Sequence, residues 1–136
     1  MLSKKRILIV DDELLIRELL YDYFAGCEYD IAVADNGQEA LDLVAEAHFD
    51  TAILDLKMPD IDGLELADRM HDRDGELPII FMTGFPSMES AIEAIRRHAQ
   101  DYFVKPFNLK HMRKAVEAAI ARSSADRQTG QREAEA

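Results

Sequence analysis

Four apolar segments of the chain each end in residues that could take part in chemistry. In chain order, the segments and the residues that end them are Arg6–Val10 with Asp11 and Asp12, Thr51–Leu54 with Asp55, Leu77–Met82 with Thr83, and Asp101–Val104 with Lys105. Short apolar, β-branched runs followed by turn residues are typical of buried strands. The sequence therefore places three carboxylates, one hydroxyl and one ammonium group directly after predicted strands.

The elements that position these residues alternate between strands and helices. A further strand is predicted at Tyr29–Ala34, and apolar residues at helical spacing predict helices near residues 14–24, 37–47, 64–71, 87–97 and 109–120. Strict alternation predicts an α/β fold with a single doubly wound, five-stranded parallel sheet flanked by five helices. Because parallel strands end at the same edge of a sheet, we expect the polar residues to converge there.

Clustered carboxylates favour a bound cation, since like charges repel unless a cation lies between them. Oxygen ligands with open positions suit Mg²⁺, and Mn²⁺ can substitute for it. A lysine and a hydroxyl next to such a metal could neutralise a phosphoryl group, and an aspartate can be the nucleophile that accepts it. A single aspartate in such a position is more often a helix cap or a solvated loop residue, so the prediction depends on the whole set.

Composition limits the class of protein. At 136 residues the chain is expected to form one domain over residues 1–122, followed by a flexible polar tail or linker stump at 123–136. No apolar run is long enough to span a membrane and no signal peptide is recognisable, so we expect a cytoplasmic protein. The single cysteine excludes an internal disulfide and a cysteine-based zinc site.

Charge is distributed unevenly along the chain. The formal net charge of −11 argues against direct binding of nucleic acid. Residues 1–83 carry seven basic and twenty acidic side chains, whereas residues 84–121 carry six basic and four acidic ones. Solvated helix faces would explain this pattern, and so would a cation site in the first part with a protein-docking face in the second.

The sequence resembles the receiver domains of response regulators, the phosphoacceptor half of bacterial two-component signalling. The resemblance covers about residues 5–121 and depends on four motifs: Ile7–Glu13, Leu54–Pro59 with Gly63, Thr83-Gly84, and Asp101–Phe107. It implies a flavodoxin-like sheet with strand order 2-1-3-4-5, for which a receiver of this family is a standard example.

The resemblance also implies roles for individual residues. Asp55 would be the phosphorylation site, with Asp11, Asp12, Asp55 and the backbone carbonyl of Lys57 around the metal. Lys105 would pair with the acyl phosphate, and its bond to Pro106 would be cis. Thr83 and Tyr102 would form the switch that responds to phosphorylation.

The implied partners are proteins. A histidine kinase or phosphotransfer protein would supply the phosphoryl group. The surface formed by the fourth helix, fifth strand and fifth helix would bind a downstream protein or a missing effector domain, or form a phosphorylation-dependent homodimer. Such a domain is a signalling phosphoacceptor that catalyses only its own phosphorylation and slow dephosphorylation, not an enzyme acting on other substrates.

Two positions depart from the family pattern or vary within it. His98 stands where the family usually has glycine, which predicts mild strain if the backbone there has a positive φ. Phe85 lies two residues after Thr83, and we expect it, together with Lys57, to set the phosphate lifetime by controlling access of water.

Two other classes of protein fit the sequence less well. A phosphatase of the haloacid-dehalogenase type would need a second aspartate two residues after its nucleophile, but position 57 is lysine. A receiver that acts only as an interaction module would not need the complete set of site residues found here. No glycine-rich nucleotide motif is present, so dinucleotide binding is not supported.

Overall fold

The computed structural model describes the backbone of residues 4–135 and the side chains of residues 4–123. In this part of the chain, strands and helices alternate as predicted. The strands are β1 (Arg6–Val10), β2 (Asp30–Ala34), β3 (Thr51–Asp55), β4 (Ile79–Thr83) and β5 (Asp101–Val104). The helices are α1 (Leu14–Gly26), α2 (Gly37–Glu46), α3 (Gly63–Arg73), α4 (Met88–Arg96) and α5 (Leu109–Glu135).

The strands form one parallel sheet in the order β2-β1-β3-β4-β5, which confirms the predicted fold and strand order. Leu54 of β3 lies opposite Val10 of β1, and Asp55 lies opposite Met82 of β4. Thr83 in turn lies opposite Val104 of β5. This register brings the carboxyl ends of β1, β3, β4 and β5 to a common edge.

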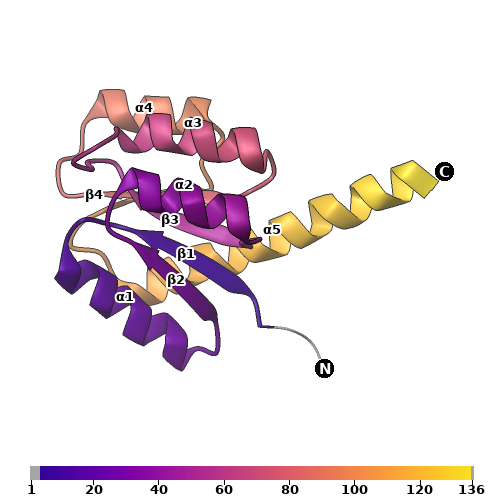
Figure 1. The fold of residues 1–136 in the computed structure, drawn as a ribbon, viewed down its shortest axis with the longest axis horizontal. Helices are drawn as coiled ribbons and strands as arrows, with labels where there is room; N and C mark the ends of the chain where they lie inside the picture. The colour runs from indigo at the N-terminus through magenta and orange to yellow at the C-terminus, as the bar shows by residue number, and fades with distance from the viewer. Residues whose placement is uncertain (1–3, 136) are drawn as a thin grey trace.

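Two hydrophobic cores lie on opposite faces of the sheet. Because successive side chains of a strand point to opposite faces, Leu8 and Val10 of β1 pack with residues of α2, α3 and α4, whereas Ile7 and Ile9 pack with α1 and α5. Figure 1 shows α1 and α2 on opposite sides of β1 and β2, and α5 extending beyond the body of the domain. All residues of β3 are buried, which explains its continuous apolar sequence.

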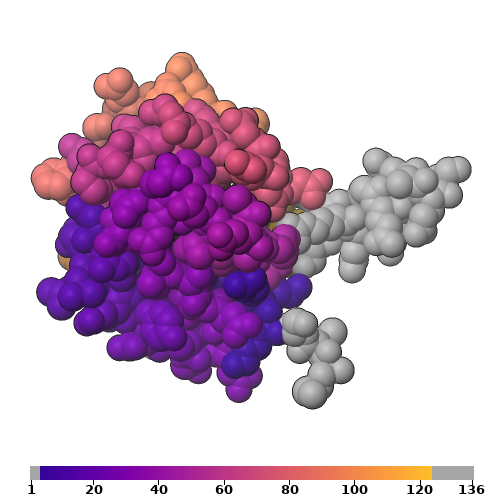
Figure 2. Space-filling view, in the orientation of Figure 1, coloured from indigo at the N-terminus to yellow at the C-terminus, as the bar shows by residue number. Residues whose placement is uncertain are grey.

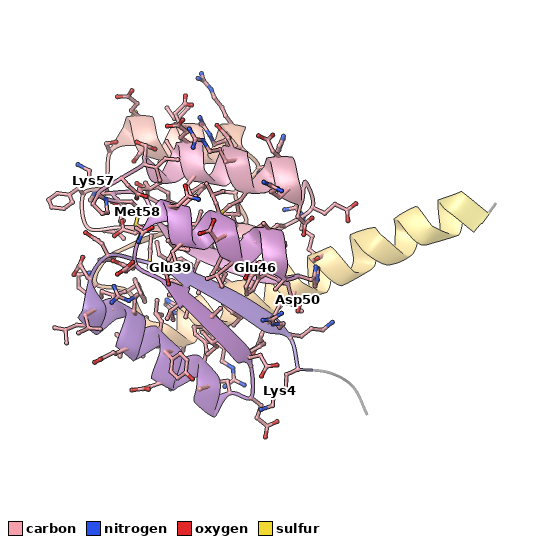
Figure 3. All side chains as sticks on the ribbon, viewed as in Figure 1. Lys4, Glu39, Glu46, Asp50, Lys57 and Met58 are labelled. Atoms are coloured by element: carbon pink, nitrogen blue, oxygen red, sulfur yellow. The ribbon has the colours of Figure 1, made fainter. Side chains whose placement is uncertain are left out.

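The two ends of the sheet differ in what they present. Lys57 and Met58 lie at the end where the strands terminate, and Lys4 and Asp50 lie at the other end (Figure 3). On the face covered by α2, α3 and α4, helices α2 and α3 contact each other and form a continuous surface (Figure 2). The predicted site residues therefore lie at one end of the molecule.

Some element boundaries differ from the sequence prediction. The strand predicted from Leu77 begins at Ile79, because the Leu77 amide donates to the Asp74 carbonyl at 3.2 Å and so belongs to the preceding turn. The tail expected at residues 123–136 is helical in its described part, since α5 continues to Glu135. The segment contains no proline and many alanine, arginine, glutamine and glutamate residues, which favour helix.

Among residues 4–135, two non-glycine residues have positive φ angles. His98 has φ 58°, as expected if it replaces a glycine in the turn before β5, and Glu28 has φ 68° in the turn before β2. This left-handed conformation costs free energy for any residue with a Cβ. Within residues 4–135, none of the helices combines the length and apolar character needed to cross a membrane.

Candidate functional site

Asp11, Asp55 and Lys105 meet at the carboxyl edge of the sheet. Asp55 is the last residue of β3, and Asp11 and Lys105 directly follow β1 and β5. The Lys105 Nζ atom lies 2.7 Å from Asp11 Oδ2 and 3.0 Å from Asp55 Oδ2. The parallel register thus joins three strands that are far apart in sequence through one ammonium group.

The ion pairs of Lys105 are shielded from solvent. The exposed fraction of the side chain is 10% for Lys105, 0% for Asp11 and 6% for Asp55. A third carboxylate, Glu13, accepts from Lys105 Nζ at 3.0 Å and is itself exposed. Buried charges need such partners because an unpaired charge out of water is costly.

Burial and pairing shift the ionisation of both buried groups. Burial raises the pKa of Asp11 to about 6, although hydrogen bonds from Lys105 and the Glu13 amide oppose the shift. Burial by itself would lower the pKa of Lys105, but its bonds to Asp11, Asp55 and Glu13 outweigh this and raise the pKa. Lys105 therefore stays charged at neutral pH, and the site favours added positive charge.

Three carboxylates are close enough to share a metal ion. Carboxylate oxygens of Asp11, Asp12 and Asp55 all lie within 4.8 Å of one another. Asp12 is exposed, so this oxygen cluster is accessible from solvent. An all-oxygen donor set with one accessible side fits a hard cation that keeps some of its water ligands. The cluster can therefore hold a metal ion.

The loop after β3 contributes a backbone donor and a side-chain contact. The Lys57 amide donates to Asp55 Oδ1 at 3.0 Å and so orients the carboxylate. The Lys57 Nζ atom lies 4.7 Å from the centroid of the Phe85 ring, a cation–π distance. Phe85 is 70% exposed, so the pair lies at the surface beside the site. A cavity of about 190 Å³ is lined by residues that include Lys57, Thr83 and Phe85.

Thr83 and Tyr102 make their hydrogen bonds away from the carboxylates. The buried Thr83 Oγ1 accepts from the Phe85 amide at 3.0 Å. The half-buried Tyr102 hydroxyl lies 2.7 Å from Ser90 Oγ on α4. The peptide bond between Lys105 and Pro106 is cis.

Several residues around the site were not predicted from the sequence. Glu13 pairs with Lys105, and Arg17 of α1 donates to the Asp11 carbonyl at 2.8 Å. Ser90 contacts Tyr102, and Asp60 contacts α2. Glu13 could have been noted as a third acid in the Asp11–Glu13 run. Nothing in the sequence indicates the partners of the others, which depend on tertiary packing.

Comparison with known proteins places the chain in a family. Residues 7–117 match the model of the response regulator receiver domain. The chain is 38% identical over 120 residues to the regulatory protein AtoC of Escherichia coli, covering 88% of this chain and 26% of AtoC. It is 34% identical over 126 residues to the response regulator MprA of Mycolicibacterium vanbaalenii, covering 93% of this chain and 54% of MprA. The chain thus spans about a quarter to a half of these relatives.

Solved structures of receiver domains support the same family assignment. A CheY-like response regulator receiver domain protein from Methanospirillum hungatei superposes with a TM-score of 0.87 at 27% identity, covering 91% of this chain and 99% of that one. The response regulator TrrA from Thermotoga maritima, solved in complex with Mg²⁺ and BeF, has a TM-score of 0.76 at 37% identity, with coverage of 85% and 98%. Together with the fold and the acidic cluster, these matches show that the chain belongs to the response regulator receiver domain family.

Proposed function

We propose that Asp55 accepts a phosphoryl group from a phosphohistidine of a histidine kinase or phosphotransfer protein. The observation that carries this proposal is the position of Lys105 Nζ, 3.0 Å from Asp55 and 2.7 Å from Asp11, beside a cluster of three carboxylates. An ammonium group fixed at this place neutralises charge that the incoming phosphoryl group brings.

The residues present fit a resident Mg²⁺ ion. Asp11, Asp12, Asp55 and the backbone carbonyl of Lys57 would hold it, and Mn²⁺ could replace it. When bound, the ion would supply positive charge that neutralises the phosphoryl group.

The transfer itself uses the side chains of this chain. An Asp55 carboxylate oxygen attacks the phosphorus, the phosphorus–nitrogen bond breaks, and its electron pair returns to the histidine ring of the donor. Lys105 stays bonded to the acyl phosphate. The Thr83 hydroxyl gives up its hydrogen bond with the Phe85 amide and bonds the phosphoryl group instead. The Tyr102 side chain then turns inward behind Thr83. These changes bias the loop and helix that precede β5.

The output surface in this proposal comprises α4, β5 and α5. On α4, Met88 is 81% exposed and Ile95 is 73% exposed, while Val104 on β5 is 45% exposed. Such apolar exposure on a mildly basic segment suits a protein partner. The candidates are an effector domain, a separate downstream protein and a second copy of the phosphorylated chain. Sedimentation velocity of phosphorylated protein distinguishes the last from the others.

Phosphorylation with a small-molecule phosphodonor and Mg²⁺, followed by intact mass measurement, tests the central claim. We expect the wild type to gain the mass of one phosphoryl group and Asp55→Asn to gain none. Asp72→Asn, at an exposed position of α3, is the control for the change in net charge and should behave as wild type. Equal phosphorylation of wild type and Asp55→Asn would assign the acceptor to another residue.

Phosphate lifetime is the second part of the proposal. The Phe85 ring and Lys57 bridge the loops on either side of the site and restrict the approach of water to the acyl phosphate. Phe85→Ala should therefore shorten the half-life of the phosphorylated protein. Met88→Ala removes an even more exposed apolar side chain from α4 and serves as the control. Equal half-lives for wild type and Phe85→Ala would contradict this role.

A further inference from the structure

Residues 56–62, here called the Asp55 loop, fold back on themselves. Lys57 and Asp62 form an isolated antiparallel bridge, and the Gly63 amide donates to the Leu56 carbonyl at 2.8 Å. A Cβ at Gly63 would collide with the Asp55 carbonyl, so glycine is needed for this close return. The loop is therefore a compact unit, and the amide of its second residue, Lys57, holds the Asp55 carboxylate.

Asp60 joins this compact loop to a different element. Its Oδ1 atom accepts from the Gly37 amide at 2.9 Å, and its Oδ2 atom accepts from the Gln38 amide at 3.1 Å. Both amides belong to the first turn of α2, where they lack a partner within the helix and where the helix dipole favours an anion. The Gly37 bond also lowers the pKa of the Asp60 carboxyl.

The role of Asp60 goes beyond capping because α2 already has a cap of its own. Asn36 is the N-cap residue, and its Oδ1 atom accepts from the Glu39 amide at 2.9 Å. Asp60 reaches the remaining amides across 23 residues of sequence, so the contact fixes the loop as much as it caps the helix. In Figure 3, Glu39 marks the end of α2 nearer to Lys57 and Met58, while Glu46 marks the opposite end.

A second contact acts on the loop from the same side. Gly37 is buried, and a Cβ added to it would collide with Ile61 Cγ2 and approach Asp60 Oδ1 to 3.4 Å. The φ angle of Gly37 is not positive, so the glycine is required here by close packing rather than by backbone conformation. The Asp55 loop is thus pulled toward α2 by Asp60 and limited in its approach by Ile61.

We propose that Asp60 is a positioning residue, which ties the Asp55 loop to α2 and thereby sets the metal affinity and phosphorylation rate of the site. The path runs from the α2 amides through Asp60 to the loop, and from the Lys57 amide to Asp55 Oδ1. This inference rests on the proposed function. A further consequence is that a partner bound at the first turn of α2 would change the phosphorylation rate without contacting Asp11, Asp12 or Asp55.

The test compares Asp60→Ala, Asp60→Asn and Gly37→Ala with wild type, with Asp72→Asn as the charge-matched control. Calorimetric titration of the metal-free protein with Mg²⁺ gives the affinity, and a small-molecule phosphodonor gives the phosphorylation rate. We expect Asp60→Ala to bind Mg²⁺ more weakly, by up to about the tenfold loss seen when a direct partner of a metal ligand is removed, because Asp60 acts on the ligands only through the position of the loop. Asp60→Asn keeps one acceptor oxygen and should lie between Asp60→Ala and wild type.

Gly37→Ala provides an independent test because it changes no charge. An effect confined to α2 would leave metal binding unchanged, since alanine favours helix over glycine. If the loop position matters, Gly37→Ala should instead weaken Mg²⁺ binding and slow phosphorylation, as Asp60→Ala does.

The outcomes separate the two claims. If wild type takes up no phosphoryl group and binds no Mg²⁺, the proposed function fails. If wild type does both, and the Asp60 and Gly37 variants match it at temperatures well below their unfolding midpoints, the positioning role is wrong. Lower thermal stability of the variants with unchanged Mg²⁺ affinity would show that Asp60 is only a cap of α2.

Discussion

One ammonium group organises the residues of the site. Lys105 directly follows β5, and it contacts Asp11, which follows β1, and Asp55, the last residue of β3. Its backbone amide also donates to the Thr83 carbonyl at 2.8 Å, which ties it to the end of β4. A lysine placed in this way gives each of these buried carboxylates a cation within hydrogen-bonding distance, which offsets part of the cost of burying a charge.

The Ser90–Tyr102 contact is expected to stabilise the resting position of the tyrosine. The two hydroxyl groups are 2.7 Å apart, and such a bond contributes about 1 kcal/mol to stability. Urea unfolding of Ser90→Ala, Tyr102→Phe and the double variant should give a coupling free energy of about this size. A coupling free energy near zero would show that hydrogen bonds to water stabilise the two hydroxyl groups as well as their bond to each other does.

The bond of Asp60 to α2 has a defined pH dependence. The pKa of the Asp60 carboxyl is lowered by its bond from the Gly37 amide. The stabilisation from this bond is therefore fully present above the ordinary pKa of aspartate, about 3.9. It is lost as the pH falls through the lowered pKa of Asp60. The nearby charged residues Glu65 and Arg69 pair with each other at 3.0 Å.

The difference in unfolding midpoint between wild type and Asp60→Asn should therefore be constant from pH 5 to 7 and shrink below about pH 4. Thermal melts across this range measure it. A difference that does not change with pH would mean that the Asp60 charge plays no part.

The types of the site residues could be predicted from the sequence, but not all of their contacts. Asp11, Asp55 and Lys105 lie at or directly after the ends of strands, and a parallel sheet brings these ends to one edge. Asp60 and Ser90 lie on a loop and a helix, where the partner depends on how two elements pack. Their neighbours are 12 to 23 residues away, and no periodicity indicates them.

At the scale of elements, the spacing of apolar residues along the chain determined which segments became strands and which became helices. Local hydrogen bonds determined where each strand and helix ends. β3 is buried on both faces and matches its predicted range. Leu77 is as apolar as the strand residues that follow it, but its amide is used in a turn. Composition alone did not reveal that α5 continues beyond Ile120, because helix-forming residues without an apolar stripe also occur in disordered tails.

The turn between α4 and β5 is expected to carry strain. His98 has φ 58°, a conformation that glycine adopts without steric cost. His98→Gly should raise the free energy of unfolding by about 1 kcal/mol. The matched control is His111→Gly in the first turn of α5, where the same change should lower stability by roughly a few tenths of a kcal/mol, the difference in helix propensity between histidine and glycine. Chemical denaturation measures both, and a loss of stability in His98→Gly would mean that the side chain makes compensating contacts.

At the scale of the whole molecule, the fold brings three acidic residues from the strongly acidic part of the chain, Asp11, Asp12 and Asp55, into one cluster. The two cores fix the sheet, and the sheet fixes the distances between carboxylates. Because the folded state alone assembles these ligands, metal binding should stabilise folding as a whole.

Mg²⁺ at one hundred times its dissociation constant should add about 2.7 kcal/mol to the free energy of unfolding. Differential scanning fluorimetry with Mg²⁺, against NaCl of equal ionic strength, measures the shift in midpoint. Asp12→Asn should show a much smaller shift because it removes one of the three clustered carboxylates. An equal shift in Asp12→Asn would place the ion elsewhere.

The bond between Lys105 and Asp11 joins residues 94 positions apart in the sequence. During synthesis, β1 and β3 emerge well before β5, and pairing of distant segments is a slow step in folding. Until β5 docks at the edge of the sheet, Asp55 has no ammonium partner. If Asp55 is the acceptor proposed above, a nascent or partly folded copy would be poorly phosphorylated, and only completely folded receivers would pass on a signal.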